Sequence, residues 1–208
     1  MSERLRPLIQ RAVLDIVEYD YQTRTEMVQL NRQMPFCVMS YLKRGEALLR
    51  IQDREYCCRD GDAIFVPPNV IHDHVKMSRE ESEFLWWHFN FRTAYNIDVL
   101  SLLKLPCKVH MENSSEFEQK FFDYMEAIQN EETIADMIYK NAKALEVLAC
   151  IFDSFLKSEK TQLAPDIPAV FMDIFDDISQ RPTAGMNLKT LAAVSYTHLR
   201  AHETRRHL

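Results

Sequence analysis

Short apolar runs separated by turn residues dominate the first half of the chain. The runs lie at residues 37–43, 47–51, 54–58, 63–66, 70–75 and 84–91. A tight turn is expected at residues 59–62 (RDGD), because glycine tolerates positive φ and aspartate side chains bond to nearby backbone groups. Short strands at this spacing are typical of an all-β sandwich or barrel.

The pattern changes to a helical period in the second half. Ser115 and Glu118 have the spacing of a capping box, and apolar residues then recur at Phe117, Phe121, Met125 and Ile128. A longer helix is expected from about Glu132 to Lys157. Its apolar stripe consists of Ile134, Met137, Ile138, Leu145, Leu148, Phe152 and Phe155. Two such helices can pack antiparallel and cover a barrel or a second subunit, and core packing alone explains the stripes equally well.

A linker is expected near Pro165 and Pro168, because prolines stop a helix and permit a domain boundary. Another amphipathic helix is expected over residues 170–178. A further short helix is expected over residues 188–194, with Asn187 as its N-cap.

Composition narrows the class of protein. Hydrophobic residues make up 47% of the 208 residues and charged residues 27%, which is enough for a packed core. No apolar run approaches the roughly 20 residues that span a bilayer, and no secretory signal is visible. The odd number of cysteines, without a C-x-x-C pair, predicts a reducing cytoplasm.

The net charge of −6 is distributed unevenly. Residues 1–111 carry 15 acids and 15 bases, residues 112–180 carry 15 acids and 5 bases, and residues 181–208 carry one acid and 5 bases. This distribution suggests three regions with different roles. The acidic middle also fits a solvated helix face, and the short basic tail alone is weak support for nucleic-acid binding.

The densest group of candidate functional residues comprises His72, Asp73, His74 and His88. Imidazoles brought together in a barrel can bind zinc, iron or copper, or they can line a ligand pocket. Strand alternation places His72 and His74 on one face and Asp73 on the other.

Gly61, Pro67, Asn69 and His72 have a spacing that resembles the second motif of the cupins, which implies a cupin-like barrel. A metal-binding cupin also needs an earlier H-x-H with a glutamate, and residues 40–52 contain no histidine. Lys76 stands where the motif ends in asparagine. We therefore expect no metal, no cofactor and no enzymatic activity; if a metal were bound, His72, His74 and His88 would be its ligands.

A wider set of residues resembles the sensor domain of the AraC family of bacterial transcriptional regulators. The set is Gly61-Asp62, Pro67-Pro68, Ile71-His72 and Trp86-x-His88-Phe89. The resemblance implies an α+β chain with a cupin-like jelly-roll sensor domain at residues 1–105. An all-α dimerisation region at residues 106–162 and a partial helix-turn-helix domain at residues 163–208 would follow.

The same resemblance implies a small-molecule effector in the barrel, often a sugar, contacted by Arg44, His74, Trp86 and His88. An indole face suits the C–H face of a sugar, while guanidinium and imidazole groups satisfy hydroxyls. An organic acid could pair with Arg44 equally well. The alternative for these residues is structural: a tryptophan that packs in the core and an arginine exposed to solvent.

The DNA-binding part departs from the family. Residues 167–180 resemble its scaffold helix, residues 188–194 resemble the first helix of the helix-turn-helix, and Thr197, His198 and Arg200 are the candidate DNA contacts. Ser195 follows Ala192 by only three positions, so the turn is too short. Residues 195–208 resemble translated non-coding sequence, and a natural basic tail is the alternative.

We therefore expect a truncated AraC-like regulator that is cytoplasmic, homodimeric, not associated with a membrane and weak in DNA binding. Two alternatives remain open at this point. One is a metal-dependent cupin enzyme of the sugar isomerase or dioxygenase type. The other is a stand-alone dimeric binding module without a role on DNA.

Overall fold

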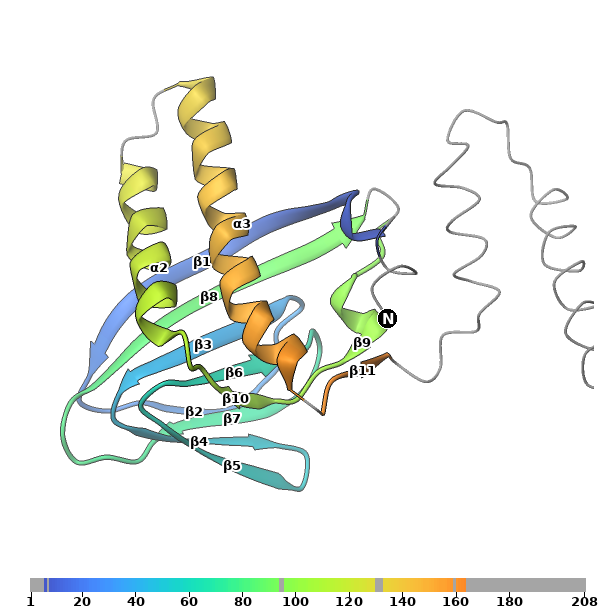
Figure 1. Cartoon of the computed structure of the whole chain (residues 1–208). Helices are drawn as coiled ribbons and strands as arrows, with labels where there is room; N and C mark the ends of the chain where they lie inside the picture. Colours follow the sequence, from blue (N-terminus) through green and yellow to red (C-terminus); the bar gives the residue numbers. More distant parts are fainter. Residues whose placement is uncertain (1–5, 7, 94–95, 130–132, 159, 164–208) are drawn as a thin grey trace, which may run out of the picture.

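Two β-sheets face each other, and two helices cover the outer face of one of them (Figure 1). The computed structural model describes residues 6, 8–93, 96–129, 133–158 and 160–163. The larger sheet contains, in spatial order, β1 (Ala12–Arg24), β8 (Ser82–Thr93), β3 (Cys37–Arg44), β6 (Asp62–Val66) and β10 (Lys108–His110). The smaller sheet contains β2 (Val28–Arg32), β7 (His72–Lys76), β4 (Glu46–Ile51) and β5 (Arg54–Arg59).

The strands predicted from residue 37 onward are confirmed with small shifts at their ends. The sequence analysis did not predict β1 and β2. β1 pairs antiparallel with β8 from Ala12 opposite Thr93 to Arg24 opposite Ser82, with a bulge between Ile16 and Glu18. These two strands matter for function, because they form one side of the cavity described below.

Strand β3 is buried on both faces, which explains its nearly continuous apolar sequence. Cys37, Met39 and Tyr41 belong to the hydrophobic core between the larger sheet and the helices. Val38 and Leu42 belong to a second core between the two sheets. The larger sheet is therefore a wall with a packed layer on each side.

The helices α2 (Ser114–Gln129) and α3 (Ile134–Lys157) supply aromatic side chains to the outer core. The ring of Phe117 lies 5.1 Å from that of Tyr41, and the ring of Phe155 lies 6.2 Å from that of Phe65. Edge-on aromatic contacts of this kind stabilise packing beyond the area they bury. The helices are thus part of the same folded unit as the sheet.

The predicted capping box at the start of the first helix is wrong. Ser115 lies inside α2, and the Glu118 carboxylate accepts a hydrogen bond from the Tyr41 hydroxyl at 2.7 Å instead. A capping box does occur at the start of α3, where Thr133 and Asp136 satisfy each other's backbone N–H groups.

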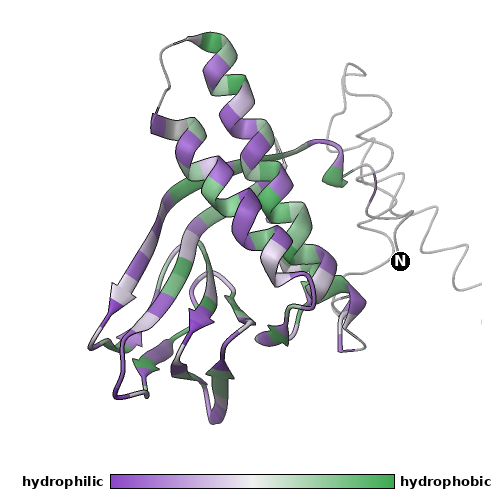
Figure 2. Ribbon diagram, turned by 60° about the vertical axis from the view of Figure 1, so that its left-hand side comes forward, coloured by the Kyte–Doolittle hydropathy of each residue, from purple (hydrophilic) through white to green (hydrophobic). Residues whose placement is uncertain are grey.

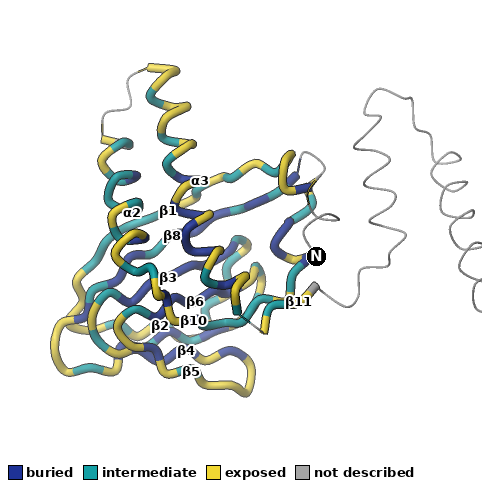
Figure 3. The backbone as a smooth tube through the Cα atoms, viewed as in Figure 1, coloured by how far each residue is buried: buried dark blue, intermediate teal, exposed yellow. Residues whose placement is uncertain are grey.

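The apolar stripe predicted for α3 divides into two parts. Leu148, Phe152 and Phe155 are buried. Ile134, Met137, Ile138 and Leu145 are 77%, 50%, 65% and 47% exposed. Figures 2 and 3 show that this half of α3 extends away from the sheet, with hydrophobic segments left exposed.

The segment expected to be all helical also contributes strands. β10 joins the larger sheet beside β6, and β9 (Leu103–Lys104) pairs with β11 (Gln162–Leu163) next to the 3-10 helix η1 (Leu100–Leu102). Among the described residues, no helix is long and apolar enough to cross a membrane. The predicted linker, the two later helices and the candidate DNA contacts Thr197, His198 and Arg200 lie outside the described residues.

The turn between β3 and β4 requires a glycine. Gly45 has a φ of +113°, and a Cβ atom there would lie 2.0 Å from Ser82 Oγ. Both the backbone conformation and the close approach of β8 therefore exclude a side chain at this position.

Candidate ligand-binding site

A cavity of about 290 Å³ lies between the two sheets. It lies on the side where β1 is the edge strand of the larger sheet and β2 is the edge strand of the smaller sheet. Its apolar lining comes from Met27, Val28, Val38, Phe84 and Trp86. Its polar lining comes from Glu18, Gln22, Arg24, Glu26, Gln29, Arg32, Ser40, His74 and His88. A concave space of this size can hold a small molecule, and its largely polar lining favours a polar one.

The polar lining groups differ in depth. Glu18, Arg24 and Glu26 are exposed, and they form the rim of the cavity. Ser40, His74 and His88 are buried, and Arg32 is half-buried. Gln22 and Gln29 are half-buried as well, so a ligand inside the cavity would meet two imidazoles, one hydroxyl, one guanidinium and two carboxamides.

His88 connects a cation inside the cavity with a carboxylate on its rim. Arg32 Nη2 lies 3.2 Å from His88 Nε2, and His88 Nδ1 lies 3.2 Å from Glu18 Oε2. Because a guanidinium only donates, Nε2 must accept, and the ring proton is assigned to Nδ1, which donates to Glu18. Burial and the positive charge of Arg32 lower the pKa of His88, so the ring is neutral in this arrangement.

His74 is one of three buried polar residues that line the cavity. Its side chain lies on β7 facing inward, and the residue is 7% exposed. Burial, followed by the nearby charges of His72 and Arg32, lowers the pKa of His74 to about 4. The ring of Phe84 contacts it edge-on at 5.8 Å. His74 therefore presents a neutral imidazole to the cavity.

The two neighbouring tryptophans of β8 face opposite sides of the wall. Trp86 lines the cavity, and its ring lies 4.8 Å from that of His88. Trp87 is fully buried in the outer core beneath the helices. Of the two, only Trp86 can contact a molecule in the cavity.

His72 lies on the same face of β7 as His74 but does not line the cavity. Its Nδ1 lies 3.0 Å from the carbonyl oxygen of Val70, and its buried Nε2 has no hydrogen-bond partner among the described residues. Within the part of the chain that the structure describes, no group of three or more His, Cys, Asp or Glu side chains is placed to hold a metal ion. His72, His74 and His88 therefore do not assemble as a ligand set.

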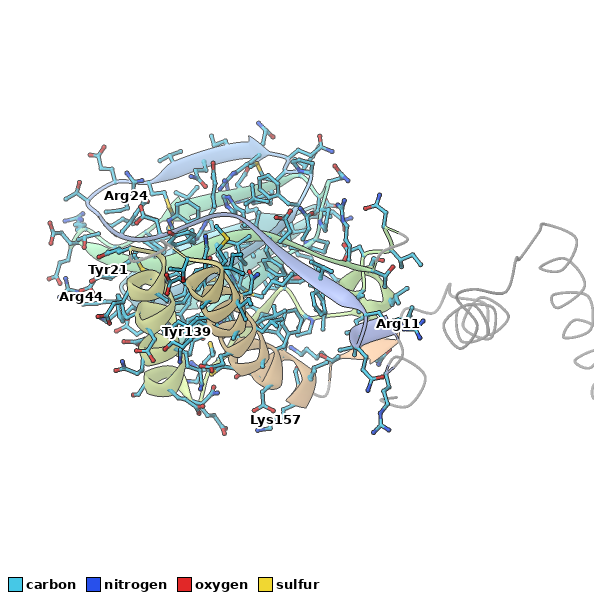
Figure 4. All side chains as sticks on the ribbon, turned by 90° about the horizontal axis from the view of Figure 1, so that it is seen from above. Arg11, Tyr21, Arg24, Arg44, Tyr139 and Lys157 are labelled. Carbon is cyan, nitrogen blue, oxygen red and sulfur yellow. The ribbon has the colours of Figure 1, made fainter. Side chains whose placement is uncertain are left out.

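Arg44 lies outside the cavity. Its Nε is 3.1 Å from Glu83 Oε1, and its side chain is 57% exposed. Glu83 also accepts from the Tyr21 hydroxyl, so Tyr21 and Arg44 lie at the same end of the molecule (Figure 4). The structure thus brings together His74, Trp86 and His88 and leaves Arg44 apart from them.

Only His74, Trp86 and His88 of the lining were predicted from the sequence, and Arg32 and Glu18 are two of the lining residues that were not. The sequence of β1 does contain an alternating pattern that predicts a strand. Its half-buried residues include Leu14 and Ile16 before the bulge, and Tyr19 and Tyr21 after it. Reading this alternation as a strand would have placed a partner beside β8.

The fold and the cavity define a cupin-like jelly roll with two helices packed on the outside of one sheet. A protein-family model described as the AraC-like ligand binding domain matches residues 29–148. This match covers more than half of the chain, so the chain belongs to that family.

Similar solved structures share only part of the chain. A cupin superfamily protein from Desulfitobacterium hafniense has 13% identity and a TM-score of 0.29, covering 37% of this chain and 75% of its own. The TT1209 protein from Thermus thermophilus has 18% identity and a TM-score of 0.31, covering 38% and 83%. The protein YhaK from Escherichia coli has 10% identity and a TM-score of 0.34, covering 45% and 47%. The comparison with curated proteins finds no match.

Proposed function

We propose that the cavity binds a small polar effector and that the chain is the sensor part of an AraC-like transcriptional regulator. The observation that carries the proposal is the cavity itself, within a domain of the AraC-like ligand-binding family. Its volume of about 290 Å³ lies at the lower end of the range for ligand pockets. The effector is therefore a small molecule, a sugar or an organic acid.

Three residues have assigned roles in this proposal. Trp86 provides a flat aromatic face on which the C–H groups of the effector stack. His74 is neutral, so it can exchange hydrogen bonds with a hydroxyl or carboxylate. His88 is neutral and already bonded at both ring nitrogens, so it positions Arg32 beside the effector. Arg44, which the family resemblance also implicates, would act only from outside the cavity, where it contacts Glu83.

The proposal extends to two macromolecular partners. A second copy of the chain would pack against the exposed half of α3. Operator DNA would be bound by a complete helix-turn-helix domain of the family's kind, whereas this chain, whose residues 188–200 depart from that pattern, should itself bind DNA weakly. Effector binding would then control the affinity of a dimeric protein for DNA.

A thermal-shift screen with sugars and small organic acids, followed by calorimetric titration of the hits, tests the effector proposal. In Trp86→Ala, affinity for a hit should fall by roughly 5- to 30-fold, because aromatic stacking contributes on the order of 1–2 kcal/mol. Tyr139→Ala is the matched control, since this aromatic residue is 56% exposed on α3 and distant from the cavity lining. Unchanged affinity in folded Trp86→Ala would show that the ligand binds elsewhere.

The alternative class is a metal-dependent cupin enzyme. It requires several ligands that converge on one point, and the described residues contain no such group. No specific observation therefore favours it. Elemental analysis of the purified protein showing about one transition metal per chain would reverse this conclusion.

A further inference from the structure

Arg32 carries a positive charge inside the cavity that no carboxylate neutralises directly. Its guanidinium contacts Gln29 Oε1 at 2.8 Å and His88 Nε2 at 3.2 Å, and both of these groups are neutral. Among the described residues no carboxylate forms an ion pair with it; Glu18 acts on it only across the ring of His88. Burying a cation without a counter-ion is unfavourable, and a bound anion would remove that penalty.

The Arg32 guanidinium also has N–H groups that no described residue accepts a hydrogen bond from. It carries five N–H groups in a planar fork, and the two contacts above occupy one on each terminal nitrogen. The remaining N–H groups can bind a carboxylate through two parallel hydrogen bonds, a geometry that lysine and neutral side chains cannot reproduce.

The charges that line the cavity are separated by depth. Glu18 and Glu26 are exposed on the rim, together with Arg24. Arg32 is the one charged side chain of the lining that is not fully exposed, and the other groups at its depth are neutral. An anion that enters the cavity therefore passes the acidic groups at the edge and meets a net positive charge inside.

His74 provides a second, independent indication of a ligand. The residue is more than nine-tenths buried and lines the cavity. The described residues give its ring nitrogens no hydrogen-bond partner, whereas His88 has partners on both nitrogens. A buried imidazole facing a cavity without a partner is satisfied when a ligand supplies one.

We propose that the effector carries a carboxylate, which Arg32 binds in the interior of the cavity while His74 bonds a neighbouring oxygen atom. This inference rests on the proposed function of the cavity and specifies its ligand class. One interior cation matches the single charge of a carboxylate, whereas a phosphate dianion would require a second. Trp86, whose ring lies 4.8 Å from that of His88, suits a carboxylic acid with a compact ring, such as a sugar acid.

Matched ligand pairs test the inference. Galacturonate and galactose differ only in whether carbon 6 is a carboxylate or a hydroxymethyl group, and glucuronate and glucose form a second such pair. Simple carboxylates, inorganic phosphate and the methyl ester of galacturonate complete the panel. We expect at least one carboxylate to bind at least roughly 10-fold more tightly than its neutral counterpart, because a hydrogen-bonded charge contributes on the order of 1.5–3 kcal/mol.

Variants at Arg32 test whether this residue causes the preference for a carboxylate over its neutral counterpart. In Arg32→Gln the affinity for the carboxylate should fall by roughly 10- to 100-fold, while affinity for its neutral partner changes little. Arg32→Lys keeps the charge without the fork and should retain a weaker preference for the acid. Arg59→Gln is the matched control, because this arginine is 78% exposed and does not line the cavity.

The outcomes separate the inference from the proposed function. Trp86-dependent binding of neutral sugars that is as tight as binding of their acids would overturn the carboxylate inference and leave the effector proposal intact. Tighter binding of phosphate than of every carboxylate would also overturn it. No binding of any compound in the panel would count against both. If Arg32→Gln does not fold, Arg32→Lys takes its place in the test. The inference is then refuted if Arg32→Lys binds the acid and the neutral ligand with the same affinities as the unmodified protein.

Discussion

The three histidines between the sheets are held neutral by their surroundings. Burial is the main cause of the lowered pKa of His72, His74 and His88, and the charge of Arg32 adds to it in each case. A neutral imidazole can both donate and accept, so this environment prepares the residues for hydrogen bonding and not for charge pairing. It also ties the stability of the fold to pH.

His74 gives the largest effect that can be assigned. Its pKa is about 4 in the folded protein, below the ordinary value of 6.5. As pH falls below 6.5 the unfolded chain takes up a proton that folded His74 does not, so the unfolded state is favoured. We expect its contribution, on the order of 3 kcal/mol, to be complete above pH 6.5 and to be lost progressively down to about pH 4.

Urea denaturation at pH values from 7.5 to 4.5 measures this effect. His74→Gln removes the titrating group while keeping a polar side chain, so its free energy of unfolding should depend less steeply on pH below 6.5. A variant that loses stability as steeply as the unmodified protein would show that His74 does not carry the effect.

At single positions, the sequence predicted orientation better than contact. Alternation correctly separated inward-facing His72 and His74 from Asp73, and the family resemblance pointed to Trp86. The sequence could not reveal that Arg32 would lie against His88, because that contact joins residues 56 positions apart. The family resemblance also associated Arg44 with the pocket, whereas the residue extends from the end of β3 toward Glu83.

Among the elements, α3 combines two different environments. Its second half packs on the larger sheet, and its first half carries Ile134, Met137, Ile138 and Leu145 largely exposed. Exposed apolar side chains that recur along one helix are typical of an interaction surface. A second copy of α3 offers the same pattern, so an isologous contact is possible.

Replacing Ile134 and Ile138 by glutamate tests that contact. We expect the dimer dissociation constant to rise by roughly 100-fold or more, because four carboxylates would have to be buried without partners. Sedimentation equilibrium measures the change. Leu156→Glu is the control, since this exposed residue lies at the other end of the helix. A monomeric unmodified protein, or a double variant that still dimerises, would refute the proposal.

Element prediction succeeded where the pattern was regular and failed where it was interrupted. The strands from residue 37 onward were predicted because each is a short apolar or alternating run bounded by turn residues, and the long helix because its apolar residues keep a helical period. β1 was overlooked because the bulge between Ile16 and Glu18 shifts its alternation by one residue. Ser115 and Glu118 have the spacing of a capping box, but the Glu118 carboxylate accepts a hydrogen bond from the buried Tyr41 hydroxyl instead.

For the whole molecule, the charge distribution bears on DNA binding. The chain has a net charge of −6, and its basic excess is confined to the last 28 residues. Affinity for a duplex depends strongly on cations that neutralise phosphates. We expect no sequence-specific binding at about 0.15 M salt, measured by gel shift with labelled duplexes and excess competitor. A specific complex that resists the competitor would contradict this expectation.

The larger sheet separates the cavity from the helical layer by the thickness of one strand layer. Trp86 faces one compartment and Trp87 the other, and β3 alternates in the same way. An exchange at Val38, Ser40, Phe84, Trp86 or His88 that shifts the backbone of β3 or β8 would therefore also shift the surface on which α2 and α3 pack. Changes of ligand preference during evolution would have to be accompanied by compensating changes beneath the helices, so the two layers are expected to co-vary.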